Sequence, residues 1–448
     1  MDVFNDQTLS SSITEDYYVR VNPTRSLDAV APIEFSLDSS HDLTDISRSY
    51  IKLAVSLTKG TSKPEHLAHL TPAQILDPSE VDPIFHDTDN AAGKSSTDSG
   101  LSVCNNLFHS LFGQVELYIN EKRIESINDY PYISYINNLL LWDIDAKNSA
   151  LSYLEGFIED TPGQFDSIAN LGSRKRIKEL ILNGKTCYLK ARINLGAFKI
   201  PQFIPNLCRI RLVLHPKRKQ FVLNYVGSGI DLDKYGIHFE QATYELRRIK
   251  VLPSALEAYE QQLKQLVSFP IERKVCTSFQ LAQGSQDISI PNMITGQLPD
   301  SVLIVLLSQA SFNGDISKNP YNFEHFGLSE ASLTIDGKIF PTPQGYKLNM
   351  KNSDFCDALA NLYGYSTAFH GIKKDQYQKG YFILPFMLQP STSGLEIPRD
   401  DVGKSGSIDG KFKFDEPLDQ TTTLLVISGY SGAFYIDNLR TVTTNYAA

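Results

Sequence analysis

Two segments of this chain repeat one pattern at a constant offset. The matched positions keep both their order and their spacing: His109 and His325, Leu117 and Leu333, and Ile119 and Ile335. In each copy, alternating residues that predict a strand are followed by a polar turn and a second strand. A repeat with so long a period indicates two copies of one β domain, not a short-period solenoid. Chance agreement among common residues such as Leu, Ile and Asn is the alternative.

The length and composition of the chain fit such a duplication. A chain of 448 residues exceeds what one hydrophobic core organises, so two or three domains are expected. The aromatic residues are almost all Phe and Tyr, 24 and 22 against one Trp, and both types favour pleated surfaces. The net charge of −9 argues against a general affinity for nucleic acid and leaves only local basic patches for that role.

The cysteines and the N-terminal residues predict the compartment. Five cysteines lie far apart without a CxxC pair: Cys104, Cys187, Cys208, Cys276 and Cys356. This pattern predicts buried thiols in a reducing compartment, not a disulfide framework. Residues 1–6 lack the apolar segment of a signal peptide, and the longest apolar run, 302–307, is too short for a membrane span. We therefore expect a soluble protein, synthesised inside a cell and not secreted.

The strand patterns divide the chain into five parts. Segments such as 33–37 and 51–57 alternate strictly and predict half-buried strands. Each copy holds roughly seven or eight such strands with long connections, which is typical of an antiparallel sandwich or jelly roll. The predicted fold class is all-β: two tandem antiparallel jelly-roll barrels with short helical insertions. The predicted parts are an N-terminal arm (1–25), a first jelly roll (26–252) with a long loop (59–100), a helical junction (253–275), a second jelly roll (276–440) and a C-terminal tail (441–448).

Helical patterns accompany this framework. Short helices are predicted at equivalent places, 132–141 after the first copy and 354–362 after the second. The clearest helix begins with a capping box formed by Ser254 and Glu257, and Pro270 ends it. Its position between the two copies makes it the candidate domain junction.

Two Gly-Lys-Ser tripeptides, 93–95 and 403–405, resemble the end of a phosphate-binding loop. Such a loop needs a glycine five residues before its last glycine, and Thr88 and Pro398 occupy those positions. Neither tripeptide follows an apolar strand. The sequence therefore predicts no nucleotide site and no cofactor.

Potential metal ligands gather in the long loop: His66, His69, His86, Asp87 and Asp89. Their spacing gives no closed tetrahedral set, and Ala91 breaks the calcium-loop pattern. We expect a solvated loop without a metal site.

Two further motifs have structural interpretations. Residues 429–433, Gly-Tyr-Ser-Gly-Ala, resemble a nucleophile elbow, but the second glycine comes one residue early. We interpret them as a glycine-rich turn between the last two strands. His109 and His325 each stand beside a Phe, and we expect both to be packed, hydrogen-bonded core residues.

The basic runs complete the candidate sites. Residues 174–176 with Lys178, and residues 217–219, could contact nucleic acid or an acidic neighbour, but most such runs are solvated faces. We find no Cys/His pair, no paired carboxylates in a recognisable frame and no dinucleotide fingerprint. The chain is therefore expected to be a structural protein and not an enzyme, without catalytic, cofactor-binding or metal-binding residues.

Several strings of this chain carry a family resemblance. They open the first barrel (31–35), lie in its middle (106–112, 115–117 and 130–132), begin the second barrel (296–299, 312–314, 318–323, 325–326 and 335–337) and continue it (381–386). In these strings, and over most of residues 20–440, the chain resembles the double jelly-roll major capsid proteins, specifically the hexon-like proteins of Polinton/Maverick elements and adintoviruses. The likeness is not a catalytic motif, so it assigns no residue roles. Residues 60–100 match nothing in the family and look like a lineage-specific loop.

The resemblance implies a structural role in a shell. Two fused barrels would form a homotrimer with a pseudo-hexagonal outline that tiles an icosahedral capsid. The implied partners are other copies, neighbouring capsomers and penton or minor capsid proteins, while contact with the genome is not indicated. The protein would be made inside the host cell and located in the virion, with the loop 59–100 on an outward tower or rim.

Three alternatives stay open. One is a penton-type minor capsid protein, against which the internal duplication argues. Another is a tandem β-sandwich that binds glycans or cell surfaces through exposed aromatics such as Tyr363 and Tyr365. The third is a β-sandwich hydrolase, for which the spacing identifies no catalytic set. Assembly into trimers would separate a capsid protein from the last two.

Overall fold

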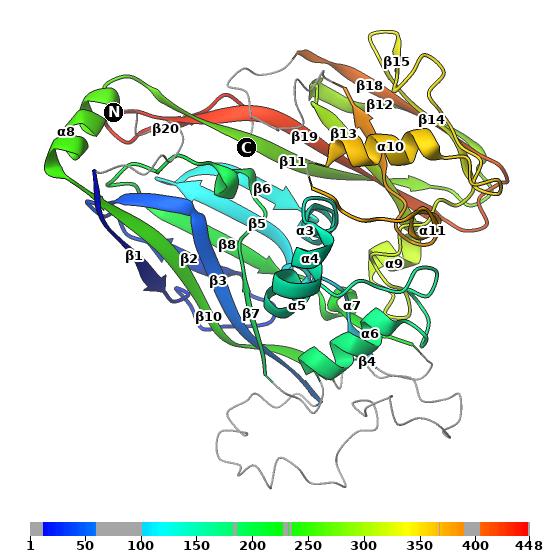
Figure 1. The fold of residues 1–448 in the computed structure, drawn as a ribbon, viewed down its shortest axis with the longest axis horizontal. Coiled ribbons are helices and arrows are strands. Elements are labelled where there is room, and N and C mark those ends of the chain that lie inside the picture. The colour runs from blue at the N-terminus through cyan, green and yellow to red at the C-terminus, as the bar shows by residue number, and fades with distance from the viewer. Residues whose placement is uncertain are drawn as a thin grey trace, which may run out of the picture.

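Two β barrels lie side by side in this chain (Figure 1). The computed structural model describes residues 12–59, 101–181, 186–226, 232, 235–366, 368–388 and 404–446. Residues 60–100 of the predicted long loop lie outside this description. The first barrel runs from the N-terminal to the middle part of the chain, and the second runs from the middle to the C-terminal part.

The first barrel consists of two four-stranded antiparallel sheets. One sheet has the order β1 (Ile13–Val21), β10 (Tyr235–Val251), β3 (Leu43–Lys59) and β7 (Cys187–Ala191). The other has the order β2 (Ile33–Leu37), β8 (Ile210–Pro216), β5 (Phe112–Ile119) and β6 (Lys122–Asn128). A short pair, β4 (Leu101–Val103) with β9 (Leu223–Tyr225), stands beside them.

The second barrel repeats this arrangement. One sheet has the order β11 (Val267–Leu281), β19 (Thr422–Ile436), β13 (Ser301–Ser308) and β17 (Leu384–Met387), with β20 (Val442–Thr444) added to β19. The other has the order β12 (Asp287–Gln297), β18 (Ser405–Phe414), β14 (Leu328–Ile335) and β15 (Lys338–Phe340), with β16 (Tyr346–Lys347) added to β14.

The strand order identifies both barrels as jelly rolls. Without the added strands β4, β9, β16 and β20, each barrel has eight main strands in chain order. In both barrels one sheet then holds the first, eighth, third and sixth strands, and the other holds the second, seventh, fourth and fifth. This interleaving of early and late strands is the jelly-roll connectivity. The predicted fold class, two tandem jelly-roll barrels, is confirmed.

The sequence repeat corresponds to one hairpin in each barrel. Leu117 and Ile119 end β5, Leu333 and Ile335 end β14, and the two strands share one burial pattern along their length. Each hairpin turns through two residues with positive φ, 48° and 65° at residues 120–121 and 47° and 77° at residues 336–337. Two left-handed residues define the type I′ turn, whose twist matches the flanking strands. The repeat is therefore structural and not a chance match.

The predicted N-terminal arm is wrong for residues 13–21. These residues form β1, the edge strand of a sheet, paired with β10 from Ile13 opposite Val251 to Val21 opposite Tyr244. Most side chains of β1 are exposed, which explains why the sequence shows no apolar alternation there. The predicted C-terminal tail likewise contains β20, which pairs with β19.

The junction helix is present, but its ends differ from the prediction. α8 (Pro253–Gln262) begins with Pro253 after Leu252, and no side chain caps it, so the capping box at Ser254 is wrong. Pro270 does not end the helix, because it lies inside β11 opposite Ala433. β11 is an edge strand, where a proline without an N–H is tolerated.

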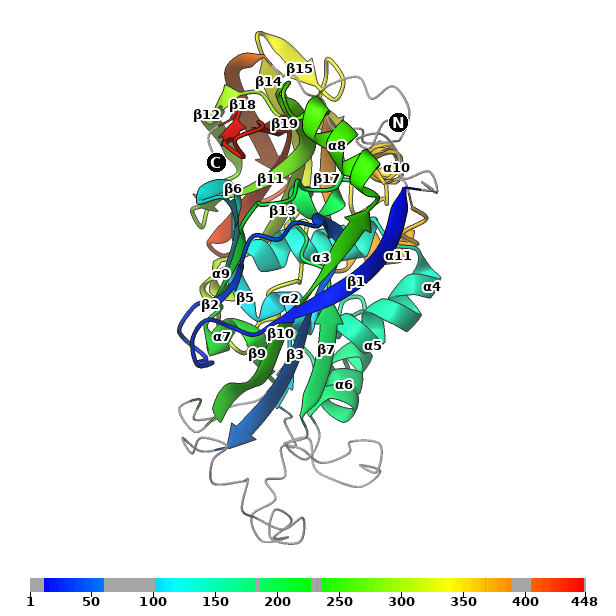
Figure 2. The same cartoon turned by 90° about the vertical axis from the view of Figure 1, so that its left-hand side faces the viewer.

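Short helices fill the connection between the fifth and sixth strands of each barrel. The first barrel has α3 (Tyr130–Leu140), α4 (Ile144–Ala146), a π-helix η4 (Lys147–Leu151), α5 (Ser152–Glu155) and α6 (Leu171–Arg176) there. The second has α10 (Cys356–Tyr365) and α11 (Lys374–Gln378). Figure 2 shows α4, α5, α6 and α11 along one side of the molecule. One continuous hydrophobic core runs through both barrels.

Replacing Glu121 by glycine should stabilise the first hairpin. Glu121 lies in the left-handed region at φ 65°, a conformation that costs a non-glycine residue on the order of 1 kcal/mol. Its ion pairs with Arg209 and Arg211, at 3.6 and 3.7 Å, contribute little, because the Glu121 side chain is 66% exposed. We expect Glu121→Gly to raise the free energy of unfolding in urea by about 1 kcal/mol.

The matched control is Gly337→Ala in the second hairpin, at φ 77°. This variant should lower the free energy of unfolding, because alanine meets the same left-handed strain that glycine avoids. Equal stabilities of the two variants would contradict the turn assignment.

Candidate functional site

A wholly buried helix joins the two barrels. Every residue of α3 is buried, and two of its three tyrosines, Tyr132 and Tyr135, contact a ring of the second barrel. Tyr135 stacks on Tyr321, with ring centroids 4.0 Å apart and 14° between the ring planes. Tyr132 meets Tyr321 edge-on at 6.0 Å. Aromatic pairs of this geometry stabilise a contact by more than the apolar area that they bury. The packing of α3 therefore stabilises the attachment of one barrel to the other.

A buried ion pair strengthens the same contact. The carboxylate of Asp160 accepts a hydrogen bond from the Arg176 guanidinium at 2.6 Å, and the two side chains are 0% and 1% exposed. The second barrel contributes Asn319, which donates to this carboxylate at 3.1 Å, and Tyr381, whose hydroxyl donates to the Asp160 carbonyl at 2.6 Å. Arg176 donates its other N–H groups to two backbone carbonyls. The predicted solvated face at 174–176 is therefore wrong for Arg176.

A second buried carboxylate lies where β6 approaches the second barrel. Glu125 accepts hydrogen bonds from the backbone N–H groups of Gly196 and Ala197 at 3.1 and 3.2 Å, both in the 3₁₀-helix η7 (Gly196–Lys199). Only glycine fits at Gly196, because a Cβ there would lie 2.0 Å from the Glu272 carbonyl oxygen of β11. Burial raises the pKa of Glu125 from its ordinary 4.5 to about 7, against the opposing effect of these backbone N–H groups.

The last described residues of the chain return to the first barrel. Arg440 donates to the Asn206 backbone oxygen at 3.0 Å and pairs with Glu260 of α8 at 2.5 Å. Tyr446 donates its hydroxyl to the Ile124 carbonyl at 3.1 Å. Together with α3, Asp160–Arg176 and Glu125, these contacts form what we call the inter-barrel seam. The seam joins the two barrels through apolar, hydrogen-bonded and charged contacts.

The histidines of the repeat have different surroundings. His109 is fully buried, with Nδ1 2.8 Å from the Tyr130 hydroxyl and Nε2 3.0 Å from Glu155. Asn138 donates to the same Glu155 carboxylate at 2.6 Å. The prediction of a packed, hydrogen-bonded histidine is confirmed for His109. His325 is only partly buried, and its Nδ1 accepts the Gly327 N–H at 2.9 Å.

The remaining candidate motifs form no catalytic arrangement. Tripeptide 93–95 and the residues His66, His69, His86, Asp87 and Asp89 lie outside the described residues. In the other tripeptide, Ser405 begins strand β18 and no helix follows it. Residues 429–433 are not a turn, because they lie within β19 and pair with β11. Close packing explains their glycines: a Cβ at Gly432 would lie 2.7 Å from the Tyr446 ring.

Three of the five cysteines, Cys104, Cys187 and Cys208, are buried as predicted, whereas Cys276 is only partly buried. Burial raises the pKa of Cys104 to about 12 and that of Cys208 to about 11, so neither forms a thiolate at neutral pH. Cys356, however, is exposed on α10.

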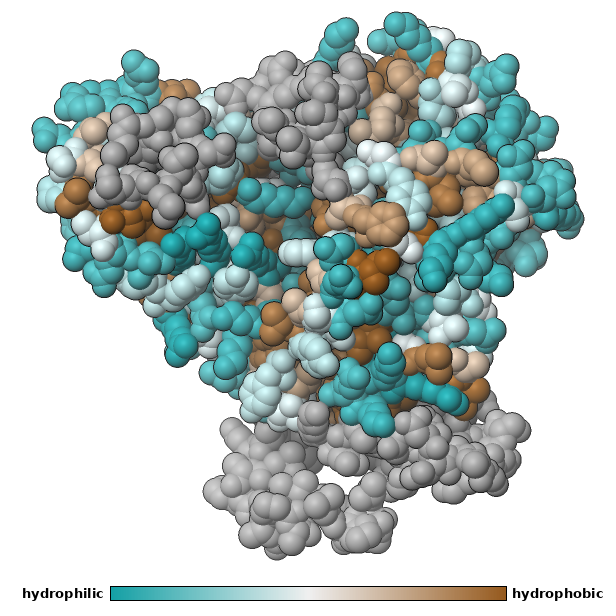
Figure 3. Space-filling model, in the orientation of Figure 1, coloured by the Kyte–Doolittle hydropathy of each residue, from teal (hydrophilic) through white to brown (hydrophobic). Residues whose placement is uncertain are grey.

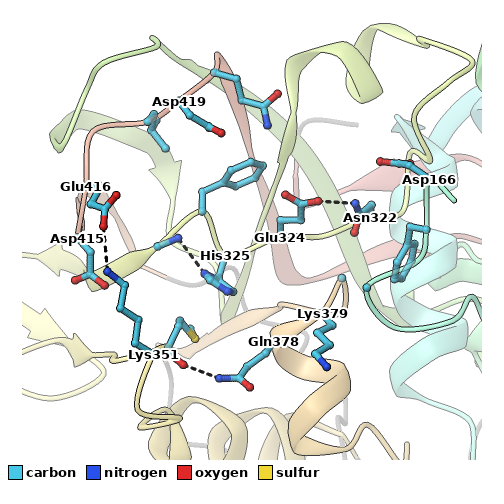
Figure 4. A pocket seen from close by; sticks show the side chains of 18 of the residues that line it. Asp166, Asn322, Glu324, His325, Lys351, Gln378, Lys379, Asp415, Glu416 and Asp419 are labelled. Carbon is cyan, nitrogen blue, oxygen red and sulfur yellow. Dashed lines mark hydrogen bonds and ion pairs between the residues drawn. The ribbon is translucent and has the colours of Figure 1, made fainter.

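A cavity of about 730 Å³ opens between residues 163–167 and loops of the second barrel (Figure 4). We call it the acidic cavity, because five carboxylates and two ammonium groups line it: Asp166, Glu324, Asp415, Glu416, Asp419, Lys351 and Lys379. Asn322 donates to Glu324 at 2.6 Å, and Lys351 pairs with Glu416 at 3.0 Å. Within the described ranges, no three His, Cys, Asp or Glu side chains are placed to hold a metal ion.

A second cavity, of about 880 Å³, is lined by the first barrel alone. We call it the basic groove, because its lining holds four cations and one carboxylate: Arg48, Lys190, Arg192, Lys199 and Glu155. Its apolar wall includes Trp142 and Leu154, which are 46% and 47% exposed. Figure 3 shows apolar side chains in the middle of the face on which Figure 1 places α4 and α5.

The described residues thus define a double jelly-roll protein with an inter-barrel seam and two surface cavities. No family model matches the chain. An uncharacterized protein of Caenorhabditis elegans is 24% identical over 295 residues, which cover 64% of this chain and 68% of that protein. None of the helices in the described part is long and apolar enough to cross a membrane.

Solved viral structures share this fold over nearly the whole chain. A chain of the Sputnik virophage, determined by cryo-EM, aligns with a TM-score of 0.62 and 12% identity, covering 100% of this chain and 92% of its own. A chain of the PBCV-1 virus capsid aligns with a TM-score of 0.56 and 11% identity, covering 99% of both. The mavirus major capsid protein aligns with a TM-score of 0.53 and 12% identity, covering 98% and 92%. At these identities the likeness establishes the fold.

Removing the buried carboxylate of the seam should destabilise the protein strongly. Asp160→Asn leaves the Arg176 charge buried without its counter-ion, and breaking such a pair costs about 3–5 kcal/mol. Urea denaturation followed by circular dichroism measures this loss. The matched control is Lys351→Met, which breaks an ion pair between side chains 73% and 78% exposed and should leave the stability unchanged. Equal effects of the two variants would contradict the role of Asp160.

Glu125 should make the stability depend on pH. Its pKa in the folded protein, about 7, exceeds its ordinary value of 4.5, so the folded state binds the proton more tightly. The resulting stabilisation is complete below pH 4.5 and is lost as the pH rises through about 7. Glu125→Gln removes this titration. Between pH 4.5 and about 7, the free energy of unfolding of the native protein should fall by on the order of 3 kcal/mol relative to that of the variant.

Urea denaturation of both proteins at several pH values between 4 and 8 measures this difference. Stability curves that stay parallel across the whole range would show that Glu125 keeps an ordinary pKa in the folded protein.

Proposed function

We propose that this chain is the major capsid protein of a Polinton/Maverick or adintovirus-type element. Three copies would form a pseudo-hexagonal capsomer that tiles an icosahedral shell. One observation carries the proposal: both barrels together, not one of them, align with chains of the Sputnik virophage and the PBCV-1 capsid over at least 99% of this chain. A relative in a nematode is compatible with an element carried by animal genomes.

The geometry of the chain suits this role. A rigid subunit of two similar barrels places six barrels around an axis when three copies close a ring through heterologous contacts. The inter-barrel seam supplies the rigidity, because it combines a continuous core with buried polar ties. A subunit that bent at the seam would not keep the hexagonal outline that tiling requires.

The proposed partners follow from the shell. Copies of this chain would contact one another within and between capsomers, and penton or minor capsid proteins would occupy the vertices. The protein would be synthesised in the host cell and reside in the virion. Two jelly rolls in one chain favour the major capsid protein over a penton-type protein, and its role would be structural and not enzymatic.

The mass of the purified protein tests this proposal. We expect light scattering to give a mass near three chains of 50.1 kDa each and negative-stain images to show hexagonal outlines. A chain that stays monomeric at all salt concentrations and pH values would overturn the capsid proposal. Retention of that monomer on a glycan matrix would then support a tandem β-sandwich binding module.

A further inference from the structure

We propose that the basic groove of one copy binds the loop 415–420 from the second barrel of the next copy. We call this segment the acidic loop. The inference rests on the proposed function, because it assigns the contact through which copies close the trimer. It also commits to one occupant of the groove, a second copy of this chain.

The groove has the chemistry of an incomplete interface. Trp142 and Leu154 expose about half of their side-chain surface on its wall. Exposed apolar side chains that lie together and are surrounded by polar residues mark interaction sites. Near the groove, Gly371 of the second barrel packs closely against Ile144 of the first. A Cβ at Gly371 would lie 2.3 Å from the Ile144 side chain. The apolar wall therefore lies beside a contact between the two barrels.

Two guanidinium groups of the groove have no internal counter-ion. Lys190 pairs with Glu245 at 2.5 Å, and Lys199 lies 3.7 Å from Glu272. Arg48 and Arg192 are exposed, and no carboxylate among the described residues lies within ion-pair distance of either. Arg192 instead donates to the Tyr50 hydroxyl at 2.7 Å. An acidic ligand would satisfy both guanidinium groups at once.

The acidic loop carries the complementary groups. It joins β18 to β19 and contributes Asp415, Glu416 and Asp419 to the rim of the acidic cavity. Asp415 and Asp419 are exposed, and within the described ranges neither has a cationic partner at ion-pair distance. Between them stands Pro417, an exposed apolar ring. The two carboxylates of this loop would pair with the guanidinium groups that line the groove, and the proline ring between them would contact Trp142.

The backbone of the acidic loop is already ordered. Leu418 is buried at 3% exposure and exchanges backbone hydrogen bonds with Gly284 and Ser285, at 2.8 and 3.0 Å. The Asp415 N–H donates to the Gly327 carbonyl at 2.8 Å. A loop held in one conformation loses little entropy on binding, which favours its use as a docking element.

The two surfaces belong to different barrels, which suits a ring. The groove is lined by the first barrel alone, and the acidic loop belongs to the second. A contact between two different surfaces is heterologous, and repeated heterologous contacts close into a cyclic oligomer when the rotation fits. The same pairing places the first barrel of each copy against the second barrel of its neighbour.

Tryptophan fluorescence tests whether the groove is covered. Trp142 is the only tryptophan in the chain, so its emission reports on this surface alone. As the concentration rises and trimers form, we expect the emission to move to shorter wavelength and acrylamide quenching to fall. Trimers whose Trp142 keeps the emission and quenching of the monomer would overturn the docking proposal and leave the proposed function standing.

A charge exchange tests the pairing itself. Arg48→Glu with Arg192→Glu, and Asp415→Arg with Asp419→Arg, should each weaken the trimer by roughly tenfold or more. The four substitutions combined should restore it. The matched control, Lys122→Glu with Lys338→Glu, reverses two exposed lysines that open the fifth strand of each barrel and should leave the trimer unchanged. Sedimentation velocity measures all four proteins, and thermal unfolding verifies that each is folded.

The outcomes separate the two proposals. Wild-type trimers that tolerate both double reversals would overturn the docking site alone. Reversals that dissociate the trimer without rescue in the combined variant would overturn the pairing of groove and loop. A wild-type chain that remains monomeric would overturn both proposals. If a charge reversal impairs folding, Trp142→Ser is tested in its place. Because Trp142 is 46% exposed, this variant should fold normally and weaken only the contact between copies.

Discussion

The structure depends on the contact between α3 and the second barrel. An eleven-residue helix with no exposed residue belongs equally to both domains, since one of its tyrosines stacks on Tyr321 while its backbone continues from the first barrel. Burial of this kind is non-directional and would tolerate many relative orientations of two barrels. The Asp160–Arg176 pair adds direction, because its hydrogen bonds require Asn319 at one position. Apolar packing holds the barrels together, and the hydrogen bonds that Asn319 and Tyr381 donate to Asp160 join them at a defined point.

The local features of this fold were predictable from sequence, and the long-range ones were not. The paired hairpins follow from alternation and from turn residues such as Asp336 and Gly337, all within a few positions of each other. β1 was missed because an exposed edge strand has no apolar period, and its place depends on β10, far away in sequence. Pro270 was misinterpreted because its lack of an N–H is harmless only at a sheet edge.

The seam residues were hidden for a related physical reason. Arg176 stands in a basic run that resembles any solvated face, and only its burial beside Asp160 distinguishes it. In the sequence, Glu125 looks like any polar residue of an alternating strand. Its role depends on η7, which places two backbone N–H groups against its carboxylate. The glycines at 429 and 432 suggested a turn, yet they allow close approach within a continuous strand. In each case the deciding partner comes from a distant part of the chain.

Duplication alone would not make a good ring, and the differences between the copies matter as much as their likeness. Two identical barrels would present the same surface twice. Either barrel of a subunit could then contact either barrel of its neighbour. Here the first barrel carries a cationic groove beside Trp142, and the second carries an ordered anionic loop around Pro417. Like charges oppose first-to-first and second-to-second contacts, whereas opposite charges favour the alternating one. Under the proposed function, this divergence lets one chain supply six barrels and still fix which barrel meets which.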